Sequence, residues 1–340
     1  MWNTLPFETA MLINLEKDLG QEKGKTYYTR YTSARDTLIT DNFFDNITGS
    51  EPNLTDHGAK HIANVLNNVH KLLGDDIDKL SGINLYCLGL IVLFHDVGNI
   101  NGRIDHNKNI SDVYNFVRKK VPKYNREKSI IVKAGEAHCG LSKDGTRDTL
   151  KDLDSSDHLD GEKVLLRDLA AILRFADELA EGPQRTSQFM MERHKYDENS
   201  QIYHQYASIT HIFIDRELGR ISLTYEIDLD LDEIDKIKFL ELLEFTFKRI
   251  IKIDEERRYT KHYCNLLIPF KMTSVKYNFY INGSSANLEI DKLEITDRFP
   301  IPGEKEITFN DFMKNGNDIS IDPNNLWEQM ISLKQKNSVE

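Results

Sequence analysis

The chain has 340 residues, of which 39% are hydrophobic and 29% are charged, a composition that predicts a folded globular protein and excludes wholesale disorder. Its formal net charge of −11 disfavours non-specific binding to nucleic acid, because such binding depends on many Lys and Arg side chains that displace counterions from phosphates. A small anionic substrate stays compatible with this charge, since bound metal ions would create a local positive field.

We expect neither a membrane-crossing segment nor a disulfide framework. The longest apolar run, residues 85–94, has about half of the residues that a bilayer crossing needs. The N-terminus lacks the basic start and apolar core of a signal peptide. The cysteines Cys87, Cys139 and Cys264 are scattered without a CxxC pair, which is typical of a reducing compartment. These features together predict a cytoplasmic protein.

Apolar residues at helical spacing predict helices over residues 6–19, 56–73, 84–94, 110–119 and 162–180. The segment 84–94, NLYCLGLIVLF, is apolar almost all round, which predicts a buried central helix that ends at His95-Asp96. The last of these helices carries Asp177 on its apolar face and is terminated by Gly182-Pro183.

After about residue 205 the periodicity changes. Alternating apolar and polar residues predict a hairpin over 207–215 and 220–228, and further strands over 264–270, 275–281 and 286–295. A long amphipathic helix is expected over 234–256. Since the length also favours two domains, we predict an α+β protein: an all-helical domain over residues 1–200, followed by a smaller α+β domain over 201–340 with an antiparallel sheet.

Histidines and aspartates recur at positions where their side chains could converge in the helical part. A lone histidine on an apolar helix face is more often a hydrogen-bonded core residue than a metal ligand. A buried ionised carboxylate is costly unless it is paired or binds a metal, so aspartates inside apolar segments indicate a site for divalent cations. The residues of this set are His57, His61, His95, Asp96, His106, His138 and Asp177.

The order of His61, then His95-Asp96, then Asp177 on separate helices resembles the HD superfamily of metal-dependent phosphohydrolases. The stretch LFHDVGNI resembles the central motif of that family and LRFADEL resembles its closing motif, so the resemblance covers roughly residues 54–186. A helical HD domain with an α+β extension is similar to a group of bacterial HD proteins. The resemblance implies a first metal ion held by His61, His95, Asp96 and Asp177.

Members of that superfamily with two metal ions carry two additional histidines between the central and closing motifs. His106 and His138 are similarly placed, which implies a second ion held by them, with Asp96 bridging the two ions. The donor types suit Mn, Fe, Zn, Mg or Ni ions. The GYP segment is absent, which argues against an enzyme for cyclic di-GMP.

Bound divalent ions would activate water and polarise phosphoryl oxygens, and the protein would supply cations for the developing charge and a proton donor for the leaving oxygen. Lys60, Arg103 and Arg185 flank the motifs and are candidates to supply positive charge, whereas a solvated surface charge is the more common role of such residues. His57 is expected to act as the acid or as a substrate contact. Cys139 has no defined base partner and is interpreted as a small buried residue.

The resulting hypothesis is a metal-dependent hydrolase of a phosphoester or phosphoanhydride bond, most plausibly in a nucleotide. A phosphodiesterase for dinucleotides, a dinucleoside polyphosphate hydrolase and a dNTP triphosphohydrolase stay open, the last being least favoured. The alternatives from other classes are a nucleotide-binding sensor with a metal site that does not turn over, and a scaffold with structural ions. Homo-oligomerisation also stays open.

Overall fold

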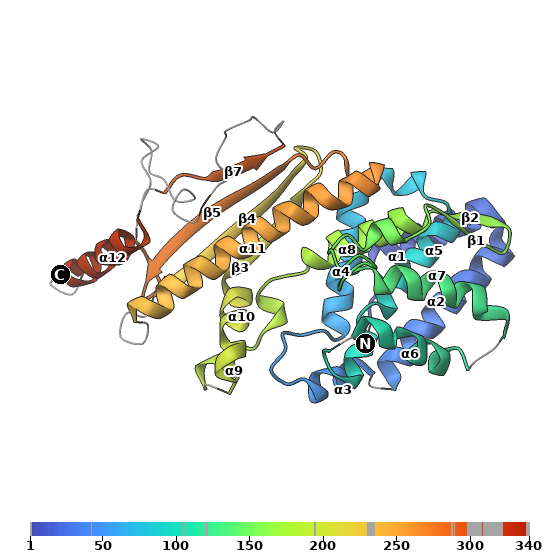
Figure 1. Ribbon diagram of the computed structural model, residues 1–340, viewed down its shortest axis with the longest axis horizontal. Helices are drawn as coiled ribbons and strands as arrows, with labels where there is room; N and C mark the ends of the chain where they lie inside the picture. The colour runs from blue at the N-terminus through green and yellow to red at the C-terminus, as the bar shows by residue number, and fades with distance from the viewer. Residues whose placement is uncertain are drawn as a thin grey trace. The chain divides into compact units, whose positions relative to one another are not determined.

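The computed structural model describes residues 2–340 apart from 42, 105, 120–121, 194, 230–234, 287, 289, 298–307, 309–321 and 338–340. By its contacts the chain divides into two compact units, which are described separately (Figure 1). Unit 1 comprises residues 1–180 and 259–269, and unit 2 comprises residues 181–258 and 270–340. The α+β class is confirmed. Because contacts alone do not define functional domains, the domains expected at 1–200 and 201–340 stay a prediction.

Unit 1 is built mainly from helices. These are α1 (Pro6–Leu19), α2 (Gln21–Thr40), α3 (Phe43–Ser50), α4 (Ala59–Leu73), α5 (Gly82–Phe94), α6 (Ile110–Val117), α7 (Asn125–Glu136) and α8 (Leu166–Glu178). Two short 3₁₀ turns, η2 (Val97–Asn101) and η3 (His106–Asn109), lie between α5 and α6. A small hairpin of β1 (Asp157–Leu159) and β2 (Glu162–Val164) precedes α8.

Helix α5 forms the centre of unit 1, as its apolar sequence predicts. All of its residues are buried, and α1, α2, α4, α6, α7 and α8 contact it. Among the described residues, the segment Gly82–Asn101 is long and apolar enough to cross a membrane, but 94% of that window is buried inside the protein. The apolar run is therefore accounted for by a core helix that ends next to His95 and Asp96.

The predicted helix over 162–180 begins later than expected, and the first domain is not purely helical. Residues 162–164 form strand β2, which pairs with β1 in an antiparallel hairpin. Asp160 and Gly161 connect the strands with φ angles of 51° and 90°. An Asp-Gly pair suits such a two-residue turn because both positions require positive φ, so the dipeptide was the sequence signal for this hairpin.

Helices α2 and α7 were missing from the predicted elements. The buried face of α2 consists of Gly24, Tyr27, Tyr31, Ala34 and Leu38, which have helical spacing, but tyrosine and glycine hide it from a pattern based on aliphatic residues. The segment of α7, NREKSIIVKAGE, is polar at its start and buries Glu127 together with its isoleucines. In both helices the burial of polar side chains obscures the apolar stripe.

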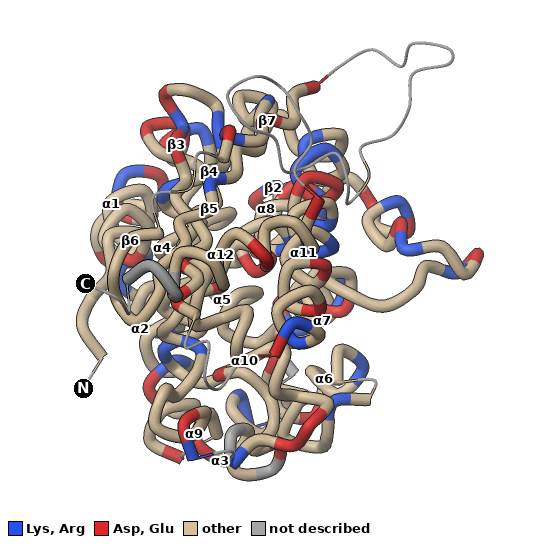
Figure 2. Tube along the Cα trace, turned by 90° about the vertical axis from the view of Figure 1, so that its left-hand side faces the viewer, with Lys and Arg blue, Asp and Glu red and all other residues tan. Residues whose placement is uncertain are grey.

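In its described residues, unit 2 combines helices with a five-stranded sheet. Its elements are α9 (Gln188–Glu192), α10 (Glu198–Ile209), β3 (Thr210–Asp215), β4 (Arg220–Leu229), α11 (Lys236–Tyr263), β5 (Met272–Ile281), β6 (Ser284–Ser285), β7 (Leu293–Thr296) and α12 (Pro323–Asn337). The predicted hairpin is the antiparallel pair β3–β4. Helix α11, along which acidic and basic residues are spread (Figure 2), leaves unit 2 after Arg258 and ends in unit 1.

The sheet is mixed, whereas an antiparallel sheet was expected. Strands β4 and β5 are parallel, with Arg220 opposite Met272 and Leu229 opposite Ile281. The remaining pairs, β3–β4, β5–β6 and β5–β7, are antiparallel. Parallel neighbours need a long crossover connection, and α11 provides it between β4 and β5.

The strand expected over 264–270 is also wrong, since residues Asn265–Leu267 form a 3₁₀ turn. Cys264, Leu267 and Phe270 are buried. Their spacing of three residues matches the repeat of a 3₁₀ helix and not the alternation of a strand. Of the strand expected over 286–295, the structure forms β7 at Leu293–Thr296, and residues 287 and 289 lie outside the described residues.

Candidate metal centre

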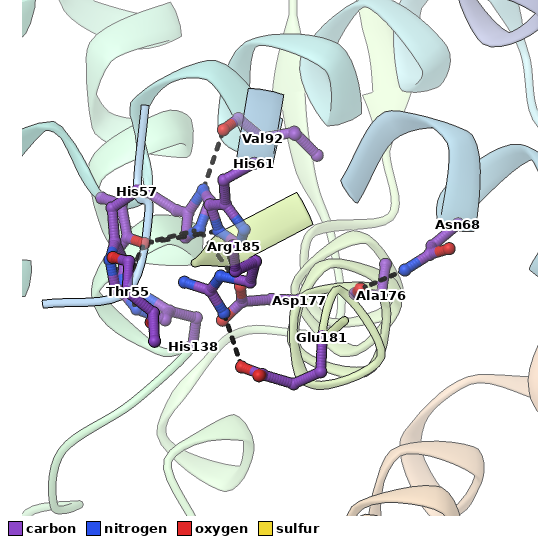
Figure 3. Close-up of polar contacts among 12 residues, drawn as sticks. Thr55, His57, His61, Asn68, Val92, His138, Ala176, Asp177, Glu181 and Arg185 are labelled. Atoms are coloured by element: carbon purple, nitrogen blue, oxygen red, sulfur yellow. Dashed lines mark hydrogen bonds and ion pairs between the residues drawn. The ribbon is translucent and has the colours of Figure 1, made fainter. Parts of the chain in front are cut away.

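Asp96 lies at the centre of the predicted constellation. It follows α5 and His95 directly, and only 4% of its surface is exposed. Helix α4 contributes His61, α8 contributes Asp177, η3 contributes His106, and the residue pair after α7 includes His138. Figure 3 shows His57, His61, His138 and Asp177 directed toward one another from these different segments. Sequence positions up to 120 apart thus meet within unit 1.

The first group consists of His61, His95, Asp96 and Asp177, whose ligand atoms lie within 4.8 Å of one another. His61 Nε2 is 3.1 Å from Asp177 Oδ1 and 3.6 Å from Asp96 Oδ2. His95 Nε2 is 3.3 Å from Asp96 Oδ2 and 3.6 Å from Asp177 Oδ1. The Nε2 atoms of two imidazoles and one oxygen from each of two carboxylates therefore surround a common space.

The second group faces the other oxygen of the same carboxylate. Asp96 Oδ1 is 3.2 Å from His106 Nε2 and 3.6 Å from His138 Nε2. The two Nε2 atoms are 3.4 Å apart. Asp96 thus directs Oδ2 toward the first group and Oδ1 toward the second, so its carboxylate connects the two candidate groups of metal ligands.

The donor atoms fit divalent cations in both spacing and chemistry. Ligands at about 2.0–2.1 Å from one tetrahedral ion lie about 3.3–3.4 Å from one another, close to the separations in both groups. Among the described residues, the buried ring nitrogens of His61 and Nε2 of His95 make no hydrogen bond. Buried imidazole nitrogens without such bonds are costly unless another partner, such as a cation, binds them.

Backbone carbonyls orient the histidines. Nδ1 of His95 donates to the carbonyl of Val92 at 2.8 Å, and Nδ1 of His106 to that of Arg103 at 3.1 Å. His138 Nδ1 bonds the carbonyl of Gly135 in the same way. When Nδ1 carries the proton, the Nε2 lone pair is free for a metal ion, so these carbonyls select the tautomer that a ligand needs.

The buried carboxylates and imidazoles of the cluster shift one another's pKa values. Burial alone would raise the pKa of Asp96, but His95, His106 and His61 outweigh it and hold this pKa well below its usual range. Burial would likewise lower the pKa of His95, but Asp96 and Asp177 raise it well above its usual value. Burial and the charge on His95 instead lower the pKa of His138, so the imidazoles of the cluster differ in their affinity for protons.

Residues outside the cluster fix its geometry. Asn68 of α4 donates to the carbonyl of Ala176 in α8 at 3.1 Å, which joins the helices that carry His61 and Asp177. A Cβ atom on Gly98 would lie 1.8 Å from the carbonyl oxygen of His106, so only glycine lets η2 and η3 approach this closely. The close approach of the His106 backbone therefore explains why the HDVG stretch has glycine at position 98.

Of the residues expected to supply charge or a proton, Arg103 and His57 lie at the cluster. Arg103 Nη1 is 4.0 Å from Asp96 Oδ1, and its side chain is 48% exposed. His57 Nε2 is 3.9 Å from Asp96 Oδ2. Lys60 is exposed in the first turn of α4, and Arg185 belongs to unit 2, where it pairs with Glu181 at 2.7 Å.

Two residues beside the cluster were not recognised from the sequence. Asn99 is fully buried, donates to the Asp96 carbonyl at 3.0 Å and accepts from Arg103 at 3.3 Å. Its position three residues after Asp96 in a 3₁₀ turn was the signal that could have identified it. Cys139 was interpreted as a small buried residue without a partner, whereas it is only partly buried and its Sγ lies 3.7 Å from His106 Nε2.

Of three comparisons with known proteins, one found a match. No curated protein and no solved structure matches the chain. A family model described as HD-CE matches residues 51–237, a region that holds every residue of both metal-ligand groups. The expected HD-type identity is therefore confirmed, and because the match spans more than half of its length, the chain belongs to the HD-CE family.

Proposed function

We propose that this protein is a metal-dependent phosphohydrolase that cleaves a phosphoester or phosphoanhydride bond of a nucleotide. The observation that carries the proposal is the division of the Asp96 carboxylate between two groups of imidazoles. Buried carboxylates that share their oxygens in this way favour two divalent cations per chain. The membership of the HD-CE family supports an HD-type hydrolase.

Bound divalent cations would lower the pKa of a coordinated water and polarise the phosphoryl oxygens of the substrate. Asp96 and Asp177 would hold the cations through charge, and His61, His95, His106 and His138 through Nε2. The carbonyls of Val92, Arg103 and Gly135 keep three of these imidazoles in the required tautomer. The residues are thus preorganised before the substrate arrives.

We assign the remaining chemistry to Arg103 and His57. The half-exposed Arg103 guanidinium, 4.0 Å from Asp96 Oδ1 and 3.3 Å from Asn99 Oδ1, would bind phosphoryl oxygens at the edge of the cluster. His57 has its Nδ1 on the Thr55 carbonyl, so its Nε2 faces the cluster and would protonate the leaving oxygen. Roles for the exposed Lys60 and the paired Arg185 stay predictions.

The test is product analysis by chromatography after incubation of the full chain with Mn²⁺ and a panel of dNTPs, cyclic mono- and dinucleotides, and dinucleoside polyphosphates. We expect cleavage by the parent, none by Asp96→Asn, and full activity in Asp112→Asn, which changes an exposed carboxyl on α6. Products would identify the bond that is attacked. If the parent retains its ions but cleaves nothing in the panel, a nucleotide-binding sensor replaces the hydrolase.

A further inference from the structure

We propose that Cys139 is a third protein ligand in the second group, so that the two ion positions have different donor sets. The proposal rests on the metal-dependent function proposed above and concerns one residue of the same site. His106, His138 and Cys139 form a group whose ligand atoms all lie within 4.8 Å of one another. Asp96 belongs to the other group, with His61, His95 and Asp177, but its Oδ1 also faces His106 and His138.

The separations in this group are those of ligands around one ion. His106 Nε2 lies 3.4 Å from His138 Nε2 and 3.7 Å from Cys139 Sγ. A tetrahedral ion with bonds of about 2.0–2.1 Å to nitrogen and about 2.3 Å to sulfur places two nitrogens about 3.3–3.4 Å apart, and nitrogen and sulfur about 3.6 Å apart. Asp96 Oδ1, 3.2 Å from His106 Nε2, supplies the fourth donor.

The local backbone directs the thiol toward His106. His138 and Cys139 follow the end of α7, and Gly140 then turns the chain with a φ of 85°, a region that favours glycine. The Asn107 side chain donates to the Glu136 carbonyl at 3.1 Å, which fastens the segment after His106 to the end of α7. His106 and His138 are both buried, and the Nε2 atoms of both lie next to Asp96 Oδ1.

The donor set determines the class of ion. Thiolate and imidazole ligands favour borderline transition ions such as Zn²⁺, Fe²⁺ and Co²⁺, whereas Mg²⁺ prefers oxygen donors and keeps several waters. The second position, with a thiolate, two imidazoles and one carboxylate oxygen, is therefore expected to reject Mg²⁺. Ligation breaks the S–H bond, and the proton leaves to solvent as the sulfur–metal bond forms.

The test is a Co²⁺ titration of the metal-free full chain, followed by absorption spectroscopy and by counting the bound ions. The parent should develop cobalt d–d bands, together with a sulfur-to-cobalt charge-transfer band in the near ultraviolet. Cys139→Ala should lose the sulfur band and bind the second ion at least about tenfold more weakly. Cys139→His should lose the band but retain two ions, and Cys264→Ser, at a buried cysteine, should behave as the parent.

Persistence of the sulfur band in Cys139→Ala, or d–d bands without any sulfur band in the parent, would overturn the role of Cys139 and leave the hydrolase proposal intact. If the folded parent binds no cobalt, the role of Cys139 and the metal-dependent function both fail. Thermal unfolding of each variant identifies a loss of fold. If Cys139→Ala does not fold, Cys139→His decides, because persistence of its sulfur band would equally exclude Cys139 as the ligand.

Discussion

Gly98 lies in close contact with the backbone of the candidate metal ligand His106. Its missing side chain lets the His106 carbonyl approach to a distance at which no Cβ atom fits. Because the carbonyl and the imidazole belong to the same residue, a displacement of the His106 backbone would disturb the 3.2 Å contact of its Nε2 with Asp96 Oδ1. The first group contains no residue of η3, so it should be less affected.

We therefore predict that Gly98→Ala weakens binding of the second ion at least about tenfold and lowers the free energy of unfolding by about 1–3 kcal/mol. Metal titration and chemical denaturation measure the two effects. Gly49→Ala is the matched control, since a Cβ atom there meets nothing within 4 Å. Equal metal binding in Gly98→Ala and the parent would show that η3 does not position the second ion.

Protons and metal ions compete for the same imidazoles. Burial alone would lower the pKa of His106, but Asp96 outweighs it and raises this pKa, as Asp96 and Asp177 do more strongly for His95. Only the neutral imidazole binds a metal, so the competing protons are gained as the pH falls through these raised pKa values. Competition by protons at His95 and His106 should therefore begin at a higher pH than for ordinary histidines, whereas burial lowers the pKa of His138.

This predicts that metal affinity falls as the pH is lowered through and below neutrality, and that metal binding releases protons near neutral pH. Isothermal titration calorimetry in buffers of different ionisation enthalpy measures the number of protons released. An affinity that stays constant as the pH is lowered through neutrality, with no proton release, would contradict this account of the charges.

At the scale of elements, the last turn of α11 supports the segment that follows His138. The Tyr259 hydroxyl donates a hydrogen bond to Asp148 Oδ1 at 2.9 Å and accepts one from the backbone N–H of Leu150 at 3.0 Å. Thr149, between these partners, bonds the carbonyl of Ala137 next to His138. The Arg174 guanidinium lies 4.7 Å from the centre of the Tyr259 ring. Residues of α11 outside the family match thus help to hold the segment that follows the candidate ligand His138.

Tyr259→Phe should lower the free energy of unfolding by about 1 kcal/mol and speed hydrogen exchange in residues 139–152, because the hydroxyl bonds both the Asp148 carboxylate and the Leu150 backbone N–H. Exchange followed by mass spectrometry locates the effect. Tyr203→Phe, at an exposed tyrosine of unit 2, should change neither quantity. Unchanged exchange in the Tyr259 variant would mean that α11 does not restrain this segment.

The helices predicted from the sequence were those whose buried faces are aliphatic, above all α5 and α4. The tyrosine-based face of α2 and the parallel pairing of β4 with β5 were not, because polar burial and long-range pairing leave no simple local period. For the site, the motif order indicated the convergence of His61, Asp96 and Asp177. The contact of Cys139 with His106 was not predicted. It joins residues 33 positions apart in the sequence, and the spacing of residues along the chain does not determine which of them the fold brings together.

At the scale of the whole molecule, the family match and the folded unit do not coincide. The match covers residues 51–237, whereas unit 1 also includes residues 1–50 and 259–269. Side chains of Phe7, Met11 and Tyr31, all from α1 and α2, lie against Gly89 at the centre of α5. Removing them would expose the most apolar helix of the protein.

We predict that the fragment 51–237 alone does not form a cooperative fold, whereas the full chain does. Thermal unfolding followed by far-ultraviolet circular dichroism distinguishes the two. A sharp unfolding transition in the fragment, near that of the full chain, would show that α1, α2 and residues 259–269 are dispensable for folding.

The central claim is that Asp96 joins two metal positions, and the most direct measurement is anomalous X-ray scattering from crystals of the full chain grown with Mn²⁺ or Zn²⁺. We predict two anomalous peaks, one beside Asp96 Oδ2 among His61, His95 and Asp177, and one beside Oδ1 at His106 and His138. A single peak, or peaks that do not contact the Asp96 carboxylate, would contradict the bridging role.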